Sequence, residues 1–251
     1  MTHFTGKNLL YYPELPSTNS LAMQLLDQPV ADGTVVRTGH QTAGRGQRGN
    51  QWLVEPRRNL TLSVIYYPHN LAAQHAFLLS KVAALAVRDC VAACCPAARA
   101  EIKWPNDILL GRRKVAGILI ETQLAGSRVQ GAALGIGLNV NQLQFPAGLA
   151  TPATSLALAL GHALDLEGVA DRLYALLESY YLRLRSGAYD GLDRSYLAHL
   201  YGYQEPVAVR IGERQGRYLL AGIDRTGRMA LSIDGRLQLF DIKEAQIVID
   251  P

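Results

Sequence analysis

Glycine, arginine and amide side chains gather in residues 41–52, which read QTAGRGQRGNQW and are called the glycine loop below. Gly44, Gly46 and Gly49 formally fit G-x-G-x-x-G, the pattern of dinucleotide-binding loops. That pattern binds a dinucleotide when a helix opens at its end and an acidic residue follows about 20 positions later. Here another predicted strand follows, and residues 56–88 contain no Asp or Glu. A Walker-type loop is excluded as well, because no Lys-Ser or Lys-Thr pair follows the glycines.

The glycine loop could bind an anion in another way. Glycine lets the backbone approach a ligand closely, and arginine offers charged hydrogen-bond donors to a phosphate or a carboxylate. Arg45 and Arg48 lie among these glycines. Such a loop has low local stability when empty and suits closing over a bound phosphate. The alternative is a mobile surface loop that binds nothing.

A second polar group, residues 103–107, reads KWPND and ends a short apolar-patterned strand. A lysine, an amide and a carboxylate this close together could hold an adenine, a phosphate or a metal ion. The alternative is a capped turn in which Trp104 serves only to pack.

Two further segments place polar residues beside glycine in buried strands. Lys114 opens the run 114–121, whose remainder is almost wholly apolar, so its side chain starts at the rim of a sheet, where a solvated strand-end charge is the alternative. Gly117 inside that run indicates a bulge or the close approach of a ligand. Residues 135–141, GIGLNVN, put two glycines and two amides, Asn139 among them, at the end of another strand. Each of these signals is weak by itself.

The elements that must position these residues form an α+β pattern. Consecutive strands separated by short gaps predict hairpins, and therefore a largely antiparallel sheet. From residue 203 on, the chain turns to short β runs with a hairpin signal at Asp234-Gly235, which predicts a small all-β barrel. We therefore expect one domain over 1–202 and a second over 203–251. Strands are predicted at 9–12, 33–39, 59–67, 100–104, 107–110, 114–124 and 129–140, and helices at 17–26, 71–95 and within 155–200, clearest at 166–184.

Composition restricts the class of protein. The 251 residues are 49% apolar, which is enough for a sizeable core, but no apolar run reaches the length of about 18–20 residues that a membrane span needs. The first residues lead into no apolar segment typical of a signal peptide, so we expect a cytoplasmic protein without membrane contact. Cys90, Cys94 and Cys95 have no second Cys or His group to complete a zinc site, and we interpret them as reduced core residues.

The charge balance does not favour a polynucleotide partner. Lys and Arg number 25 against 21 Asp and Glu, a net charge of +4. The cations are mostly arginines and occur in pairs or triplets at most, such as 57–58 and 112–114. Arginine grips planar anions through its fixed fork of donors, so this distribution suits a small phosphorylated ligand better than DNA.

Together, these motifs resemble those of the biotin protein ligases. The segments 17–19 (STN), 41–46, 103–107, 114–119 and 135–141 occur in that family's order and spacing, and the resemblance covers roughly residues 8–250. It implies a class II synthetase-like (biotin/lipoate ligase) catalytic domain and a C-terminal SH3-like β-barrel. It also implies a monofunctional form without an N-terminal DNA-binding domain, since sixteen residues precede Ser17.

The resemblance implies ATP-dependent attachment of biotin to one lysine of a biotin carboxyl carrier protein, through a biotinyl-5′-AMP intermediate. Biotin and MgATP would be substrates, with no tightly bound cofactor, and Mg²⁺ would bridge the phosphates without an assigned protein ligand. In the first step a carboxylate attacks a phosphate, so positioning and positive charge should dominate.

Specific roles also follow from the resemblance. Lys114 would lie between the biotin carboxylate and the α-phosphate, Arg45 would supply a loop cation, and Asp107 would accept a proton from the carrier lysine. The biotin pocket would contain Ser17, Thr18, Asn19, Gln41, Arg45, Gly46, Gln47, Lys114 and Gly117. The nucleotide side would contain Arg45, Arg48, Trp52, Lys103, Asn106, Asp107 and Asn139.

The sequence departs from the family pattern at Gln47 and Asn50, where many members carry further basic residues. We therefore predict an active enzyme that retains its adenylate less firmly. Two alternatives are a lipoate-type ligase or acyltransferase and a non-catalytic biotin sensor. A transcription regulator would need a helix-turn-helix domain before Ser17. A monomer and a homodimer paired at a sheet edge both fit the sequence.

Overall fold

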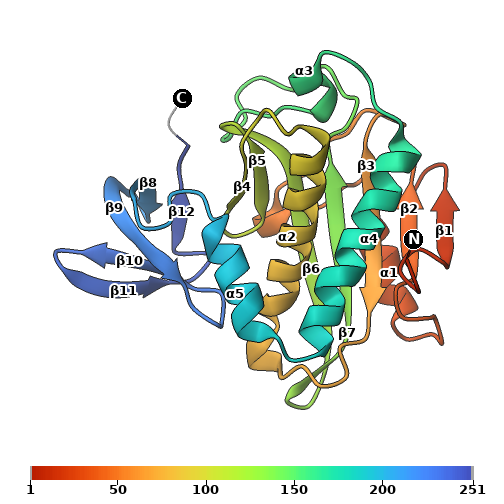
Figure 1. Ribbon diagram of the computed structural model, residues 1–251, viewed down its shortest axis with the longest axis horizontal. Coiled ribbons are helices and arrows are strands. Elements are labelled where there is room, and N and C mark those ends of the chain that lie inside the picture. Colours follow the sequence, from red (N-terminus) through yellow and green to blue (C-terminus); the bar gives the residue numbers. More distant parts are fainter. Residues whose placement is uncertain (1, 250–251) are drawn as a thin grey trace.

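The computed structural model describes residues 2–249, except for the side chain of Arg48. A seven-stranded sheet forms the centre of the molecule, with strand order β1-β2-β3-β7-β6-β5-β4 (Figure 1). Only the β1–β2 pair of this sheet is parallel. The predicted α+β class with a mixed, largely antiparallel sheet is thus confirmed. The strands are β1 (Leu9–Tyr12), β2 (Val35–Thr38), β3 (Leu60–Tyr66), β4 (Ala100–Lys103), β5 (Asp107–Leu110), β6 (Arg113–Ala125) and β7 (Arg128–Leu138).

The two faces of this sheet are covered differently. Helices α2 (Phe77–Cys94), α4 (Leu166–Arg185) and α5 (Tyr189–Ala198) lie on one face, and α1 (Thr18–Leu25) lies on the other (Figure 1). Side chains of a strand alternate between faces. Accordingly, Leu134 and Ile136 of β7 belong to the large core below α2 and α4, while Ala133 packs beneath α1. The small residues on the α1 face leave room for a cavity.

The helices depart from the predicted bounds where the backbone has other partners. Ala72 forms a β-bridge with Arg128 and Ala73 donates to the carbonyl of Ser127, so the predicted helix from residue 71 begins only at Phe77. A short 3-10 helix, Ala73–His75, fills the gap. The predicted helical region 155–200 is divided into α3 (Leu156–Leu160), α4 and α5.

A second, five-stranded antiparallel sheet follows residue 203 and lies beside α5 (Figure 1). Its hairpin at Asp234-Gly235, where both residues have positive φ, confirms the predicted turn. The closure of this sheet into a barrel and the domain division at 202/203 stay predictions. The strands, in the order β11-β10-β9-β8-β12, are β8 (Pro206–Ile211), β9 (Arg214–Ile223), β10 (Met229–Ile233), β11 (Arg236–Phe240) and β12 (Ala245–Ile247).

Candidate active site

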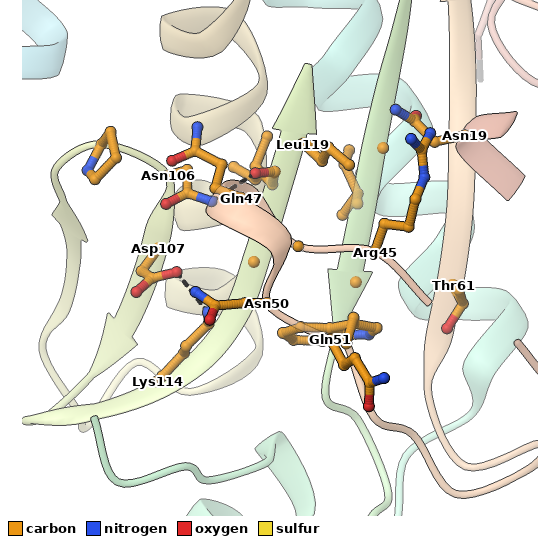
Figure 2. A pocket seen from close by; sticks show the side chains of 18 of the residues that line it. Asn19, Arg45, Gln47, Asn50, Gln51, Thr61, Asn106, Asp107, Lys114 and Leu119 are labelled. Atoms are coloured by element: carbon orange, nitrogen blue, oxygen red, sulfur yellow. Dashed lines mark hydrogen bonds and ion pairs between the residues drawn. The ribbon is translucent and has the colours of Figure 1, made fainter. Parts of the chain in front are cut away.

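A cavity of about 410 Å³ lies on the α1 face of the central sheet, beneath the glycine loop (Figure 2). Of the predicted site residues whose side chains are described, all but Asn139 line it. The side chain of Arg48 lies outside the described residues. The lining residues that were predicted are Ser17, Thr18, Asn19, Gln41, Arg45, Gly46, Gln47, Trp52, Lys103, Asn106, Asp107, Lys114 and Gly117.

Paired glycines form the floor of the cavity. Gly117 of β6 lies opposite Gly137 of β7, and the indole of Trp52 rests on both. A Cβ atom at Gly117 would lie 2.9 Å from that indole, and one at Gly135 would lie 2.6 Å from Oδ1 of Asn19. Glycine is therefore required here by close approach of side chains to the sheet.

One end of the cavity holds two lysines around a carboxylate. Nζ of Lys114 lies 2.6 Å from Oδ1 of Asp107, and Nζ of Lys103 lies 3.5 Å from Oδ2 of the same residue. The β4–β5 hairpin brings Lys103 opposite Asp107, and a register shift between Ile108 and Leu109 brings Lys114 alongside. Lys103 also donates to the hydroxyl of Thr151 at 3.3 Å. This end can bind an anion, because a ligand oxygen can replace Asp107 as the partner of either ammonium group.

Lys103 and Lys114 differ in their exposure. Only 5% of the Lys103 side chain is exposed, against 26% of the Lys114 side chain, whose ammonium also lies 5.4 Å from the centre of the Trp52 ring. A buried ammonium needs fixed partners, whereas a more exposed one can exchange them for a ligand. Lys114 is therefore better placed than Lys103 to exchange Asp107 for the reacting group of a ligand.

The other end of the cavity is polar and mostly uncharged. Oε1 of Gln41 accepts from the backbone N–H of Thr18 at 2.9 Å and from its hydroxyl at 3.2 Å. Oγ of Ser63 lies 2.9 Å from Oγ1 of Thr18 and 3.0 Å from Oδ1 of Asn19. The Ser17 hydroxyl caps α1 by accepting from the Ser20 N–H. Such a row of amides and hydroxyls suits a ligand ring that has both donors and acceptors.

Arg45 lies at this polar end rather than beside the lysines. Its guanidinium donates to Oε2 of Glu121 at 2.6 Å, and Nδ2 of Asn19 donates to the same oxygen at 2.5 Å. Figure 2 shows the Arg45 side chain directed toward Asn19 and away from the Lys114–Asp107 pair. In the structure the predicted loop cation is thus neutralised by a carboxylate.

Two predicted amides serve the backbone. Nδ2 of Asn106 donates to the carbonyl of Ile118 at 2.8 Å while the residue still lines the cavity. Asn139 is buried outside the cavity, where its Nδ2 donates to the carbonyl of Thr154 at 3.0 Å. Its predicted contact with the nucleotide stays a prediction.

Sequence reasoning missed several residues of the site. Leu119 on β6 could have been found from its two-residue spacing to Gly117, which places it on the cavity face, whereas Thr61 on β3 had no predicted site residue beside it. Glu121 shares that spacing on β6, so the same reasoning could have found it. Nothing local distinguishes Thr151 or Gln246, because each reaches the site from a distant element. Residues 2–249 contain no group of three or more His, Cys, Asp or Glu side chains that could hold a metal ion. None of the described helices is long and apolar enough to cross a membrane.

Comparisons of the sequence and of the fold with known proteins point to the same family of ligases. The model of the biotin/lipoate A/B protein ligase family matches residues 11–139. A biotin–[acetyl-CoA-carboxylase] ligase of Paracoccus denitrificans is 37% identical over 220 residues, which are 86% of this chain and 90% of that protein. The corresponding ligase of Mycobacterium tuberculosis is 37% identical over 209 residues, covering 82% and 75% of the two chains. Among solved structures, biotin protein ligase from Aquifex aeolicus in complex with biotin and ATP has a TM-score of 0.80 at 24% identity, covering 97% of this chain and 100% of that one.

Proposed function

The chain belongs to the biotin/lipoate A/B protein ligase family, and on that premise we propose that it attaches biotin to a lysine of a biotin carboxyl carrier protein. The reaction uses ATP and proceeds through biotinyl-5′-AMP. The observation that carries this proposal is the cavity itself, in which a polar end and a doubly cationic end share one glycine floor.

The polar end fits the ureido ring of biotin. That ring offers two N–H donors and a carbonyl acceptor, which match the hydroxyl of Thr18 and the amides of Asn19 and Gln41. These side chains already form hydrogen bonds with neighbouring protein groups. A ureido ring can replace those bonds with its own, so no buried donor or acceptor loses its partner when the ring binds. The dithiolane ring of lipoate lacks such groups, which favours biotin over the lipoate-type alternative.

The cationic end fits the first step. A carboxylate oxygen of biotin attacks the α-phosphorus of MgATP, a new P–O bond forms, and the bond to pyrophosphate breaks. Lys114 and Lys103, which both pair with Asp107 at this end, would reduce the repulsion between the two anions and stabilise the charge that develops on the phosphate. Holding both reactants on one rigid sheet also removes part of the entropic barrier.

The second step transfers the acyl group. The amine of the carrier lysine attacks the carbonyl carbon of the mixed anhydride, AMP leaves, and the amine loses a proton. Asp107 is the carboxylate of the cavity closest to both lysines, and once a phosphate takes over its ammonium partners it is free to accept that proton.

A transfer assay tests the whole reaction. The purified protein is incubated with MgATP and a biotin carboxyl carrier protein, in parallel with biotin and with lipoate, and the carrier mass is measured. We expect the mass to rise by one biotinyl group and to stay unchanged with lipoate. Lipoyl transfer would establish the alternative ligase. Tight biotin binding without any transfer would establish the sensor.

Two further expectations belong to this proposal. We propose that the enzyme works in the cytoplasm without a DNA partner, which the scattered arginine pairs and triplets of the sequence favour. We also keep a homodimer paired through a sheet edge as a prediction. Of the two end strands of the central sheet, β4 already forms a bridge from Ile102 to Leu200, so β1 is the candidate edge.

A further inference from the structure

Arg45 and Glu121 join the glycine loop to the central sheet. Arg45 lies in the loop and Glu121 on β6, 76 positions apart in the chain, and their ion pair is 2.6 Å long. From this geometry we infer that the pair is a clamp that holds the glycine loop over the cavity, with Glu121 as its positioning residue. The role of the clamp in retaining a ligand rests on the function proposed above.

Glu121 is well placed to anchor a loop. It follows Gly117 and Leu119 on the cavity face of β6, a strand paired along its length with β7. Oε2 of Glu121 accepts from Arg45 and also from Asn19 on α1. One carboxylate oxygen therefore ties together the sheet, the glycine loop and the first turn of α1.

The other contacts of the loop show why this anchor matters. The loop forms its own small hairpin, in which Trp52 donates to the carbonyl of Gly44 and Gly46 donates to that of Asn50. These bonds set the loop's shape but do not attach it to the sheet. Among the described contacts beyond residue 43, attachment to the sheet comes from the Trp52 indole on the glycine floor and from the Arg45–Glu121 pair.

The exposure of the pair suits a clamp that can open. The side chains of Arg45 and Glu121 are 46% and 31% exposed, so solvent and salt weaken their attraction. A substrate can therefore enter without breaking a buried ion pair. Asn19 contacts Glu121 through Nδ2 and Ser63 through Oδ1. A ligand ring at the polar end would contact Asn19 as well, and a fixed Asn19 keeps Glu121 in position for Arg45.

This assignment differs from that of a cation in direct contact with the phosphate, and the two make opposite predictions for one substitution. If Arg45 served the phosphate, neutralising Glu121 would release it and speed the formation of the adenylate. If the pair is a clamp, neutralising Glu121 loosens the loop and shortens the lifetime of the bound adenylate.

The experiment compares Glu121→Gln, Arg45→Gln and the double variant in two measurements. Hydrogen exchange of the amides of residues 44–51 is recorded in the ligand-free protein, and the dissociation of biotinyl-5′-AMP is followed without carrier. For each single variant we expect both rates to rise about threefold to fivefold, the size that a partly exposed ion pair gives. The double variant should match a single one, because the interaction is already lost.

Glu167→Gln is the matched control, since Glu167 pairs with Arg37 outside the cavity at 2.7 Å. It should leave loop exchange and adenylate dissociation unchanged. The inference is overturned if Glu121→Gln leaves both rates at the wild-type value, if it speeds adenylate formation, or if the single effects add in the double variant. Failure of the proposed function would instead appear as absent biotinyl-5′-AMP in the wild type, and loop exchange would still report the clamp.

Discussion

Lys114 is the side chain on which the first chemical step depends most. Its ammonium is the more exposed of the two at the cationic end, yet Asp107 and the Trp52 ring fix its position. An incoming carboxylate and phosphate both gain by pairing with it. Lys103 is buried and held by Thr151 and Asp107, so it contributes a fixed positive potential.

Lys114→Ala should lower the rate of biotinyl-5′-AMP formation by about a hundredfold or more, the usual size when a donor to a developing anion is removed. Pyrophosphate release measures this rate, and circular dichroism checks that the fold is kept. Arg113→Ala is the matched control, because Arg113 is an exposed neighbour outside the cavity. Near-normal pyrophosphate release by Lys114→Ala would refute the role of this lysine.

Gln47 is a cavity residue at a position where the resemblance leads us to expect a cation. An arginine at that position would add a charged donor beside the phosphate and should retain the intermediate longer. We expect Gln47→Arg to release biotinyl-5′-AMP several-fold more slowly than the wild type in the absence of carrier. Equal release rates of the two proteins would show that residue 47 does not control retention.

At the residue scale, the predictable part of the site is the part encoded in short motifs. Lys103, Asp107 and Lys114 were identified from local patterns, and the fold brings them together. Thr151 could not be identified in this way, because it meets Lys103 from 48 positions away. Strand spacing places Glu121 on the cavity face, but its pairing with Arg45, 76 positions away, leaves no local signal. Only tertiary structure shows that the expected loop cation has an internal counter-ion.

At the scale of elements, a short segment after β7, residues 151–154 (the strap below), contacts both lysines. The backbone of Lys114 donates to the carbonyl of Pro152 at 2.7 Å and accepts from Thr154 at 2.9 Å, forming a parallel β-bridge. The hydroxyl of Thr151 accepts from Lys103, and Asn139 holds the carbonyl of Thr154. The strap therefore sets the separation of the two ammonium groups.

Thr151→Val removes the hydroxyl while keeping the shape of the side chain. Because a hydrogen bond to a charged group is lost, we expect KM for ATP to rise about tenfold, with the affinity for biotin unchanged. Thr151→Ser keeps the hydroxyl and should restore the wild-type KM. A valine variant with normal kinetics, or a serine variant as impaired as the valine one, would contradict this role.

Element boundaries were predictable where local signals decide them and uncertain where distant contacts do. The strands β3, β5 and β6 agree closely with the predicted runs, since each ends at a turn visible in the sequence. The start of α2 was wrong because the β6–β7 turn, more than fifty positions away, binds the backbone of Ala72 and Ala73. Hydrophobic periodicity contains no information about such a contact.

At the scale of the whole molecule, the two sheets are joined next to the active site. The indole N–H of Trp104, within the KWPND motif, donates to the carbonyl of Gly227 in the β9–β10 turn at 2.9 Å. Gly227 lies so close to the Phe77 ring of α2 that a Cβ atom would not fit. Arg225 of the same turn pairs with Asp190 of α5. Residues 245 and 246 of β12 complete the lining of the cavity.

Trp104→Phe removes the N–H donor and leaves a buried carbonyl without its partner. We expect a loss of about 1–3 kcal/mol in the free energy of unfolding, measured by urea titration. The transition should remain single in both proteins, because one continuous core contains residues of both sheets. Two separate transitions in the wild type would show that the C-terminal sheet unfolds on its own.

The central claim is that one cavity joins biotin to AMP. Its most direct test is pyrophosphate release by the purified protein with MgATP, measured with biotin, with lipoate and without an acid. We predict release that requires both ATP and biotin. Without carrier protein it should show a burst of about one equivalent and then continue slowly, at the rate at which the adenylate dissociates. Release that is independent of biotin, or that occurs only with lipoate, would contradict the account.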